Sequence, residues 1–222
     1  MNLMLEGRTF EEELVDKLLL LYLIEKANCN GLAEGITKIT KLSFLSEHTM
    51  ILKKNKGFNY NYFRYEQGPY SKELADDFKK LLKEEMIAQR DHYTFLTPRG
   101  KEILDGSSEL LEINQSFADE IDEVCKKYAP HTLTSIKKDV YGLVLGIEGP
   151  YKNFKIKNIP QCADILVKLD VRNAVKEFKL SIDWCETLEL LMDNDSMISF
   201  EKSMEDTKKG RIYSYEQLAR GI

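Results

Sequence analysis

The feature that most constrains this chain is an uninterrupted run of seven apolar residues, 18–24, with charged residues on both sides. A helix that is apolar all round must be buried, because water would otherwise meet hydrocarbon on every face. The run is far shorter than the roughly 20 residues that a membrane-spanning helix needs. It therefore predicts a helix inside a globular core. The sequence Thr9-Phe10-Glu11-Glu12 has the form of a capping box and predicts that this helix begins at about residue 10.

Composition and charge narrow the class of protein further. The chain has 222 residues, of which 43% are apolar, so it can bury a core in one domain or in one domain with an appendage. Its formal net charge of −5 argues against a protein that coats nucleic acid, so any DNA contact must come from a local patch. The first residues lack a secretory signal, and we expect a cytoplasmic protein that does not enter a membrane. The four cysteines are at least 23 residues apart, which indicates reduced thiols rather than a zinc site or a disulfide framework.

The N-terminal part predicts the elements of a winged helix in order. A helix over about 37–53 is followed by an aromatic-rich strand over 58–65. Ser71 is a good N-cap for a helix over 72–83, and short apolar runs on either side of a polar junction predict a hairpin over 86–96. We therefore expect a mainly α, α+β protein with a winged-helix-like N-terminal domain, extra helices and a helical C-terminal arm.

Proline and glycine residues divide the remainder of the chain. Amphipathic helices are predicted over 108–128 and about 132–144, and residues 154–156 are predicted as a strand in the loop that follows. We place the domain boundary in this loop. The predicted organisation is a winged-helix-like domain over 1–150, with its winged core at about 10–104 and its added helices at about 108–144, a linker over 151–177, and a helical tail over 178–222.

Three segments of the N-terminal domain carry a family resemblance. They are the stretch 63–74 (Phe-Arg-Tyr-Glu-Gln-Gly-Pro-Tyr-Ser-Lys-Glu-Leu), the Leu-Thr-x-x-Gly sequence at 96–100, and the helix 136–141 (Ile-Lys-Lys-Asp-Val-Tyr). Together they resemble the Panacea, or SocA-like, domain family, whose members usually carry Tyr-Gly-Pro where this chain has Gln-Gly-Pro at 67–69. The resemblance covers about 11–145. It implies a winged-helix-like fold with added helices, no known catalytic residues, and frequent occurrence as the antitoxin of a toxin–antitoxin pair.

The C-terminal tail predicts short helices with narrow apolar stripes. Asp183 and Glu186 have capping-box spacing before a helix that ends near residue 194, a second helix is predicted over 196–209, and residues 214–217 have the spacing of a further capping box. Helices of this length are marginal in isolation, so they need a surface to lie on. Periodicity alone leaves two surfaces open, the chain's own body and a groove on another protein.

The order of residues in the tail carries a second resemblance. Residues 183–191 read Asp-Trp-x-Glu-Thr-Leu-Glu-Leu-Leu, and residues 199–218 join Ser-x-Glu-x-Ser-Met-Glu-Asp-x-Lys-Lys-Gly-Arg to Ile-Tyr-Ser-Tyr-Glu-Gln-Leu. This series resembles the C-terminal neutralising segment of RelB-type and Phd-type antitoxins. It implies a cognate protein toxin as partner, RelE-like, ParE-like or another small toxin. The residues expected to bind it are Trp184, Leu188, Leu191, Met197, Phe200, Met204, Ile212, Tyr213, Tyr215 and Leu218. Intervening Glu201, Glu205 and Asp206 would pair with a basic toxin surface.

A winged-helix regulator that binds operator DNA is the main alternative. The helix over 72–83 would enter the major groove and the hairpin would be the wing. The residues available for DNA contact are Lys72, Lys79, Lys80, Lys83, Arg90 and His92. Glu73, Asp76 and Asp77 on the same helix offset these cations. In this alternative the tail packs on the body or forms a homodimer, and a third option is a phage-associated adaptor.

The sequence lacks the residue patterns that catalysis needs. The acidic runs 11–13 and 76–77 are interpreted as solvated charge clusters, and the Gly-x-x-x-Gly segment at 142–146 has no following Lys-Ser/Thr of a phosphate loop. The three histidines have no partner nearby in the sequence. We therefore expect a protein that is not an enzyme, that carries no metal ion or cofactor, and that neutralises a toxin by direct binding.

Overall fold

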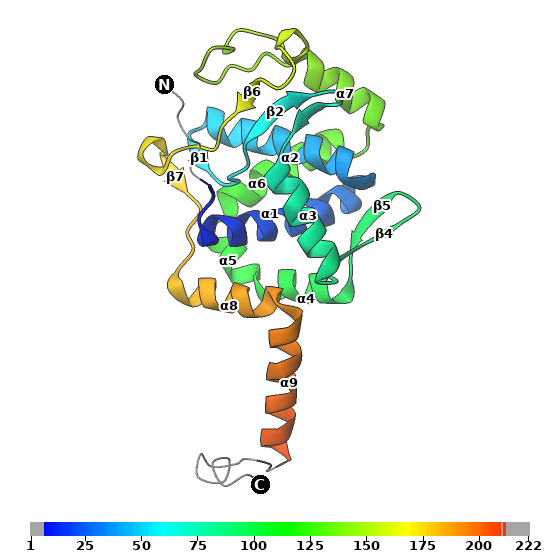
Figure 1. Cartoon of the computed structure of the whole chain (residues 1–222), viewed down its shortest axis with the longest axis vertical. Coiled ribbons are helices and arrows are strands. Elements are labelled where there is room, and N and C mark those ends of the chain that lie inside the picture. The colour runs from blue at the N-terminus through cyan, green and yellow to red at the C-terminus, as the bar shows by residue number, and fades with distance from the viewer. Residues whose placement is uncertain (1–6, 210, 212–222) are drawn as a thin grey trace.

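The structure is a computed structural model that describes residues 7–209 and 211. Helices predominate in it and the strands form small sheets (Figure 1), which confirms the expected mainly α, α+β composition. The helices are α1 (Phe10–Asn30), α2 (Gly35–Leu52), α3 (Lys72–Lys83), α4 (Pro98–Gly106), α5 (Ser108–Ile113), α6 (Gln115–Tyr128), α7 (Leu133–Gly142), α8 (Ile182–Met192) and α9 (Asn194–Lys208), with 3₁₀ turns η1 (Ile156–Asn158) and η2 (Val171–Asn173). The strands are β1 (Asn55–Lys56), β2 (Tyr62–Tyr65), β3 (Gly68–Tyr70), β4 (Ile87–Arg90), β5 (Tyr93–Leu96), β6 (Asp164–Leu166) and β7 (Lys176–Glu177).

Helix α1 lies at the centre of the body, where it contacts α2, α3, α4, α6 and α8. All residues of the apolar run 18–24 are buried, as predicted. The capping box also forms, because the Glu12 amide donates to Thr9 Oγ1 (3.2 Å) and the Thr9 amide donates to Glu12 Oε2 (3.1 Å). Burial of one leucine side chain is worth about 1.5–3 kcal/mol, so this run supplies a large share of the core.

Helix α3 and the β4–β5 hairpin form where the local sequence predicts them. Ser71 Oγ accepts from the Leu74 amide (3.2 Å) and caps α3. The hairpin turns through Asp91 and His92, whose φ angles of 49° and 71° suit the two-residue turn that matches the twist of antiparallel strands. Gly100 of α4 lies so close to the backbone just before β4 that an added Cβ would be 2.0 Å from the Met86 carbonyl oxygen. Only glycine fits at this position.

The β2–β3 turn packs against α7 and α2. The Tyr141 hydroxyl donates to the Glu66 carbonyl (2.8 Å), across 75 residues of sequence. The buried Lys41 ammonium donates to the Pro69 carbonyl (2.7 Å). Gly68 has a φ of +95°, a conformation that favours glycine. The Gly-Pro turn is therefore held by side chains from two helices.

The strand predictions differ in part from the structure. The strand predicted over 58–65 is confined to β2, because the backbone amide of Asn59 donates to Asp16 Oδ1 (2.7 Å) instead of to a neighbouring strand. Of residues 154–156, only Lys155 forms a β-bridge, and the backbone then enters η1.

The helix predicted over 108–128 is broken at Asn114 into α5 and α6. The side-chain amide of buried Asn114 donates to the carbonyls of Leu110 and Lys179 (2.9 Å each) and accepts from the Lys179 amide (2.6 Å). Asparagine side chains compete in this way with helical hydrogen bonds. The break therefore attaches the segment before α8 to the body.

Residues 151–177, predicted as a linker, are joined to the body by strands. Strand β6 pairs antiparallel with β2, which gives the sheet order β3–β2–β6, and β7 pairs parallel with β1. Ile165 and Leu166 of β6 are buried. Strands of two or three residues are too short to show an alternating pattern, which explains why the sequence predicted a linker here.

A buried ion cluster connects the start of the chain to α1 and α3. Arg8 Nη1 lies 2.7 Å from Asp16 Oδ2 and 2.6 Å from Asp77 Oδ2, and both carboxylate side chains are fully buried. The Tyr60 hydroxyl also donates to Asp77 (3.2 Å). Removing one member of a buried ion pair costs about 3–5 kcal/mol, because it leaves an uncompensated charge. The cluster therefore fixes α1 against α3.

Glu47 of α2 is a buried carboxyl whose oxygens have no hydrogen-bond partner among the described residues. Burial raises the pKa of Glu47 well above its usual range, Asp16 raises it further, and Lys56 opposes the shift. The folded chain thus holds the carboxyl proton of Glu47 more tightly than the unfolded chain does. The contribution of Glu47 to stability therefore falls as the pH rises above the unfolded pKa of about 4.3.

We expect Glu47→Gln to be nearly neutral at about pH 4 and increasingly stabilising as the pH rises to about 7, by up to about 1.4 kcal/mol per pH unit. Urea unfolding of the variant and the parent at each pH measures the difference in free energy. Glu112→Gln, at an exposed position, is the control and should show no such slope. A Glu47→Gln difference that does not change with pH would contradict the account.

Candidate functional site

Helix α8, the first predicted toxin-binding helix, packs on the body. Leu188 is fully buried in the chain's own core, and Trp184 and Leu191 are half-buried against it. Arg99 Nη2 of α4 donates to the Leu191 carbonyl (3.0 Å). The expectation that Leu188 binds a toxin is therefore corrected, because its side chain is already enclosed. Trp184 and Leu191 expose only part of their side chains to a partner.

The N-terminus of α8 also differs from the expectation. The predicted capping box of Asp183 and Glu186 does not form. Ser181 is the N-cap instead, with Oγ accepting from the Trp184 amide (3.3 Å). The chain reaches this point already fixed by Asn114, so the serine rather than the aspartate occupies the capping position.

Helix α9 projects away from the body (Figure 1), and none of its described side chains is buried. Asp193 caps it by accepting from the Ser196 amide (2.9 Å), a bond that lowers the pKa of Asp193. At the same end, the Asn194 amide donates to Glu84 Oε2 of the body (3.2 Å). These contacts fix the base of the helix.

One face of α9 carries three of the predicted anchors. Met197, Phe200 and Met204 are three and four residues apart, a spacing that places them on one side of a helix. Phe200 is 48% exposed and Met204 is 46% exposed. The structure thus brings these anchors together on an uncovered face. Four other predicted anchors lie outside the described residues: Ile212, Tyr213, Tyr215 and Leu218.

The surface around the α8–α9 corner is acidic. Residues 180–201 contain six carboxylates and no lysine or arginine. Five of these carboxylates are exposed and form no ion pair with a described residue: Asp183, Glu186, Glu189, Asp193 and Asp195. By contrast, Glu205 and Asp206, which were expected to face a basic toxin, pair with Lys209 and Arg211 of the same segment. Sequence reasoning chose Glu201, Glu205 and Asp206 and missed the other five carboxylates of 180–201, although the absence of cations there was visible.

The residues predicted to contact DNA do not form one basic surface. On α3, Lys79 lies 3.3 Å from Asp76, Lys80 lies 3.1 Å from Glu13, and Lys83 lies 3.2 Å from Glu84. Lys72 is exposed at the start of the helix. Arg90 and His92 line a hollow with the first residues of α2, Glu34 to Thr37, and no α3 lysine contributes to that lining.

The described residues show no assembled catalytic or metal-binding group. No cluster of three or more His, Cys, Asp or Glu side chains that could hold a metal occurs among them. Glu12, in the acidic run 11–13, is held by Lys56 (2.7 Å) and Lys168 (2.6 Å). No helix in the described part of the chain has the length and apolar character needed to cross a membrane. No known protein family, curated protein or solved structure matches the chain.

The contrast between α8 and α9 gives a test in solution. We expect Leu188→Ala to lower the free energy of unfolding by about 2–5 kcal/mol, because it leaves a cavity in the core. Phe200→Ala should change it by less than about 0.5 kcal/mol, because surface changes rarely matter more. Urea unfolding monitored by circular dichroism measures both. Equal losses in the two variants would show that α9 lies against the body in solution.

Proposed function

We propose that this protein is an antitoxin that neutralises a cognate toxin by direct binding through the α8–α9 corner and the residues that follow it. The observation that carries the proposal is α9 itself. Its apolar face of Met197, Phe200 and Met204 stands clear of the body, and the segment 180–201 carries six carboxylates and no lysine or arginine. An amphipathic helix with anchors at such spacing is suited to lie in an apolar groove of a partner.

The charge of the corner supports a basic partner. An enzyme that cuts RNA must be positively charged where it holds phosphates, and the exposed carboxylates over 183–195 would attract such a surface. Apolar and aromatic anchors supply most of the affinity at an interface, so Phe200 is the residue expected to matter most. Helix α8 serves as the fixed base of this binding surface, because its own Leu188 and Met192 side chains are buried in the core of the body.

The proposal includes a Panacea-like, winged-helix-like body. Its support is the order of elements, in which α3 is followed directly by the antiparallel β4–β5 hairpin. The residues behind the resemblance also have definite structural roles. Gly68 and Gly100 occupy positions that favour or require glycine, and Tyr141 holds the turn that contains Gly68.

Growth rescue tests the proposed function. We expect co-expression of the full chain to restore growth of cells that express the toxin candidate, the small protein encoded beside it. Phe200→Asp combined with Met204→Asp should abolish rescue, because each anchor at such an interface is worth about 2 kcal/mol or more. The matched control, Leu32→Asp combined with Val171→Asp, changes two exposed apolar residues of the body and should still rescue. No rescue by the full chain, or equal rescue by both variants, would contradict the proposal.

The structure also determines which truncation is informative. Deletion of residues 178–222 would remove Phe178 and Leu188 from the core, so a loss of rescue could reflect unfolding. Deletion of 194–222 leaves α8 in place and removes α9 and the residues that follow it. This shorter deletion should abolish rescue while the body keeps its unfolding transition.

The regulator alternative keeps one supporting observation, the succession of α3 and the β4–β5 hairpin. If α3 enters a major groove, Lys79→Glu combined with Lys80→Glu should abolish binding to the promoter of its own gene in a gel-shift assay and leave toxin neutralisation intact. The ion pairs of these lysines with Asp76 and Glu13 reduce the charge available for DNA, which disfavours this alternative. We expect the double variant to keep growth rescue, because neither lysine lies in α8 or α9.

A further inference from the structure

The segment between α7 and β6 forms a fixed hairpin-like loop. The Leu145 amide donates to the Phe154 carbonyl (3.1 Å), and the Ile156 amide donates to the Leu143 carbonyl (3.0 Å). Leu145 and Ile156 are buried in the core. His48 Nε2 of α2 lies 2.6 Å from the Leu145 carbonyl oxygen. The loop is therefore anchored along its length, with Ile147 and Tyr151 packed against the core and Asn153, Phe154 and Lys155 exposed.

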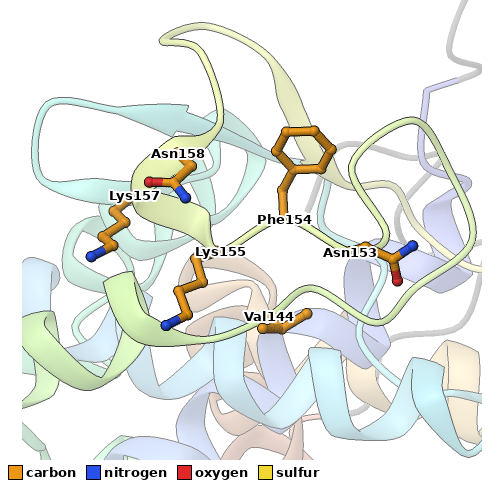
Figure 2. A pocket seen from close by; sticks show the side chains of 6 residues that line it. All are labelled: Val144, Asn153, Phe154, Lys155, Lys157 and Asn158. Carbon is orange, nitrogen blue, oxygen red and sulfur yellow. The ribbon is translucent and has the colours of Figure 1, made fainter.

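These exposed side chains line a hollow of about 510 Å³ (Figure 2). Its lining consists of Val144, Asn153, Phe154, Lys155, Lys157 and Asn158. Phe154 is 48% exposed and Val144 is 46% exposed, so an aromatic ring and an aliphatic side chain are open to a ligand. The volume lies within the range of small-molecule sites, about 300–1,000 Å³.

The polar groups of the hollow have no partners within the described part of the chain. Lys155 and Lys157 are exposed and form no ion pair there, unlike Lys152, which pairs with Glu148. The side-chain amides of Asn153 and Asn158 make no hydrogen bond there. Two unpaired cations, two free amides and one open ring therefore occupy the same small concave surface.

The uneven distribution of charge over the molecule favours anion binding at the end that carries the hollow. Residues 137–157 contain five lysines against two carboxylates, whereas residues 180–201 contain six carboxylates and no cation. The loop after α7 lies at one end of the body, and α8 lies at the other end, from which α9 projects (Figure 1). A polyanion would therefore be repelled by the α8–α9 corner and attracted to the hollow.

We propose that this hollow binds a nucleotide of a single-stranded nucleic acid. Lys155 and Lys157 would hold phosphates, the base would stack on Phe154, and the amides of Asn153 and Asn158 would meet its edge. Each amide offers both a donor and an acceptor, as base edges require. A cationic groove with an aromatic platform is the usual means of binding single strands with little sequence preference. The inference does not depend on the toxin, and it concerns a surface separate from α3.

Fluorescence anisotropy with a labelled single-stranded oligonucleotide of about twelve residues, as DNA and as RNA, tests the inference on the full chain. We expect Lys155→Glu combined with Lys157→Glu to weaken binding at least about tenfold and to reduce the slope of log K against log salt by about 1.4, or 0.7 per lost phosphate contact. Phe154→Ala should weaken binding about tenfold through lost stacking. Lys126→Glu combined with Lys127→Glu, at two exposed positions of α6, is the matched control, because it changes the net charge equally away from the hollow and should have little effect.

Competition experiments identify the form of the ligand. An unlabelled mononucleotide that displaces the strand at similar concentration would support the site and show that a free nucleotide is its ligand. Weak competition would support the strand form. A duplex that binds as tightly as the single strand, equal weakening by the two double-lysine variants, or no binding by the parent protein at about 100 μM, the weak end of non-specific affinity, would each overturn the inference. Unchanged unfolding transitions confirm that the exposed substitutions leave the fold intact.

Discussion

The burial of residues 18–24 of α1 on all sides is the constraint on which the rest of the structure depends. A helical segment with no polar face can be stable only if other elements cover it, and here helices α2, α3, α4, α6 and α8 and strand β5 pack against α1. The same arrangement encloses Asp16 of α1 and Asp77 of α3, and Arg8 pairs with both carboxyl groups. Hydrophobic burial thus brings the helices together, and the ion cluster selects how α1 and α3 meet.

The elements with strong local signals could be predicted from the sequence. The apolar run over 18–24, the capping box of Thr9, the N-cap at Ser71 and the hairpin over 86–96 all form as expected. Each depends on neighbours within a few residues. Asn114 shows the limit of such signals. Its side-chain amide breaks the predicted helix and donates to the backbone carbonyl of Lys179, 65 residues away.

The candidate site shows why a residue pattern is less informative than its tertiary position. Leu188 and Phe200 belong to apolar stripes of similar spacing, yet one is enclosed by the core and the other faces outward. Helix α8 is the more apolar of the two helices, but the spacing of the stripes alone does not show which one is covered. What separates them is the attachment of the chain before α8, through Asn114 and through Phe178, whose ring lies 5.6 Å from that of Phe117. The lysines of the hollow were missed for a related reason, since they matter only once the loop is folded around them.

The pairing of early strands with late ones has a consequence for synthesis on the ribosome. Strands β1 and β2 emerge within the first third of the chain, but their partners β7 and β6 come more than one hundred residues later. N-terminal segments usually fold first as they emerge. Here the sheet edges of the nascent chain stay unpaired until residues 164–177 leave the exit tunnel. The body and the base of its projecting helix are therefore completed almost together, once these residues have emerged.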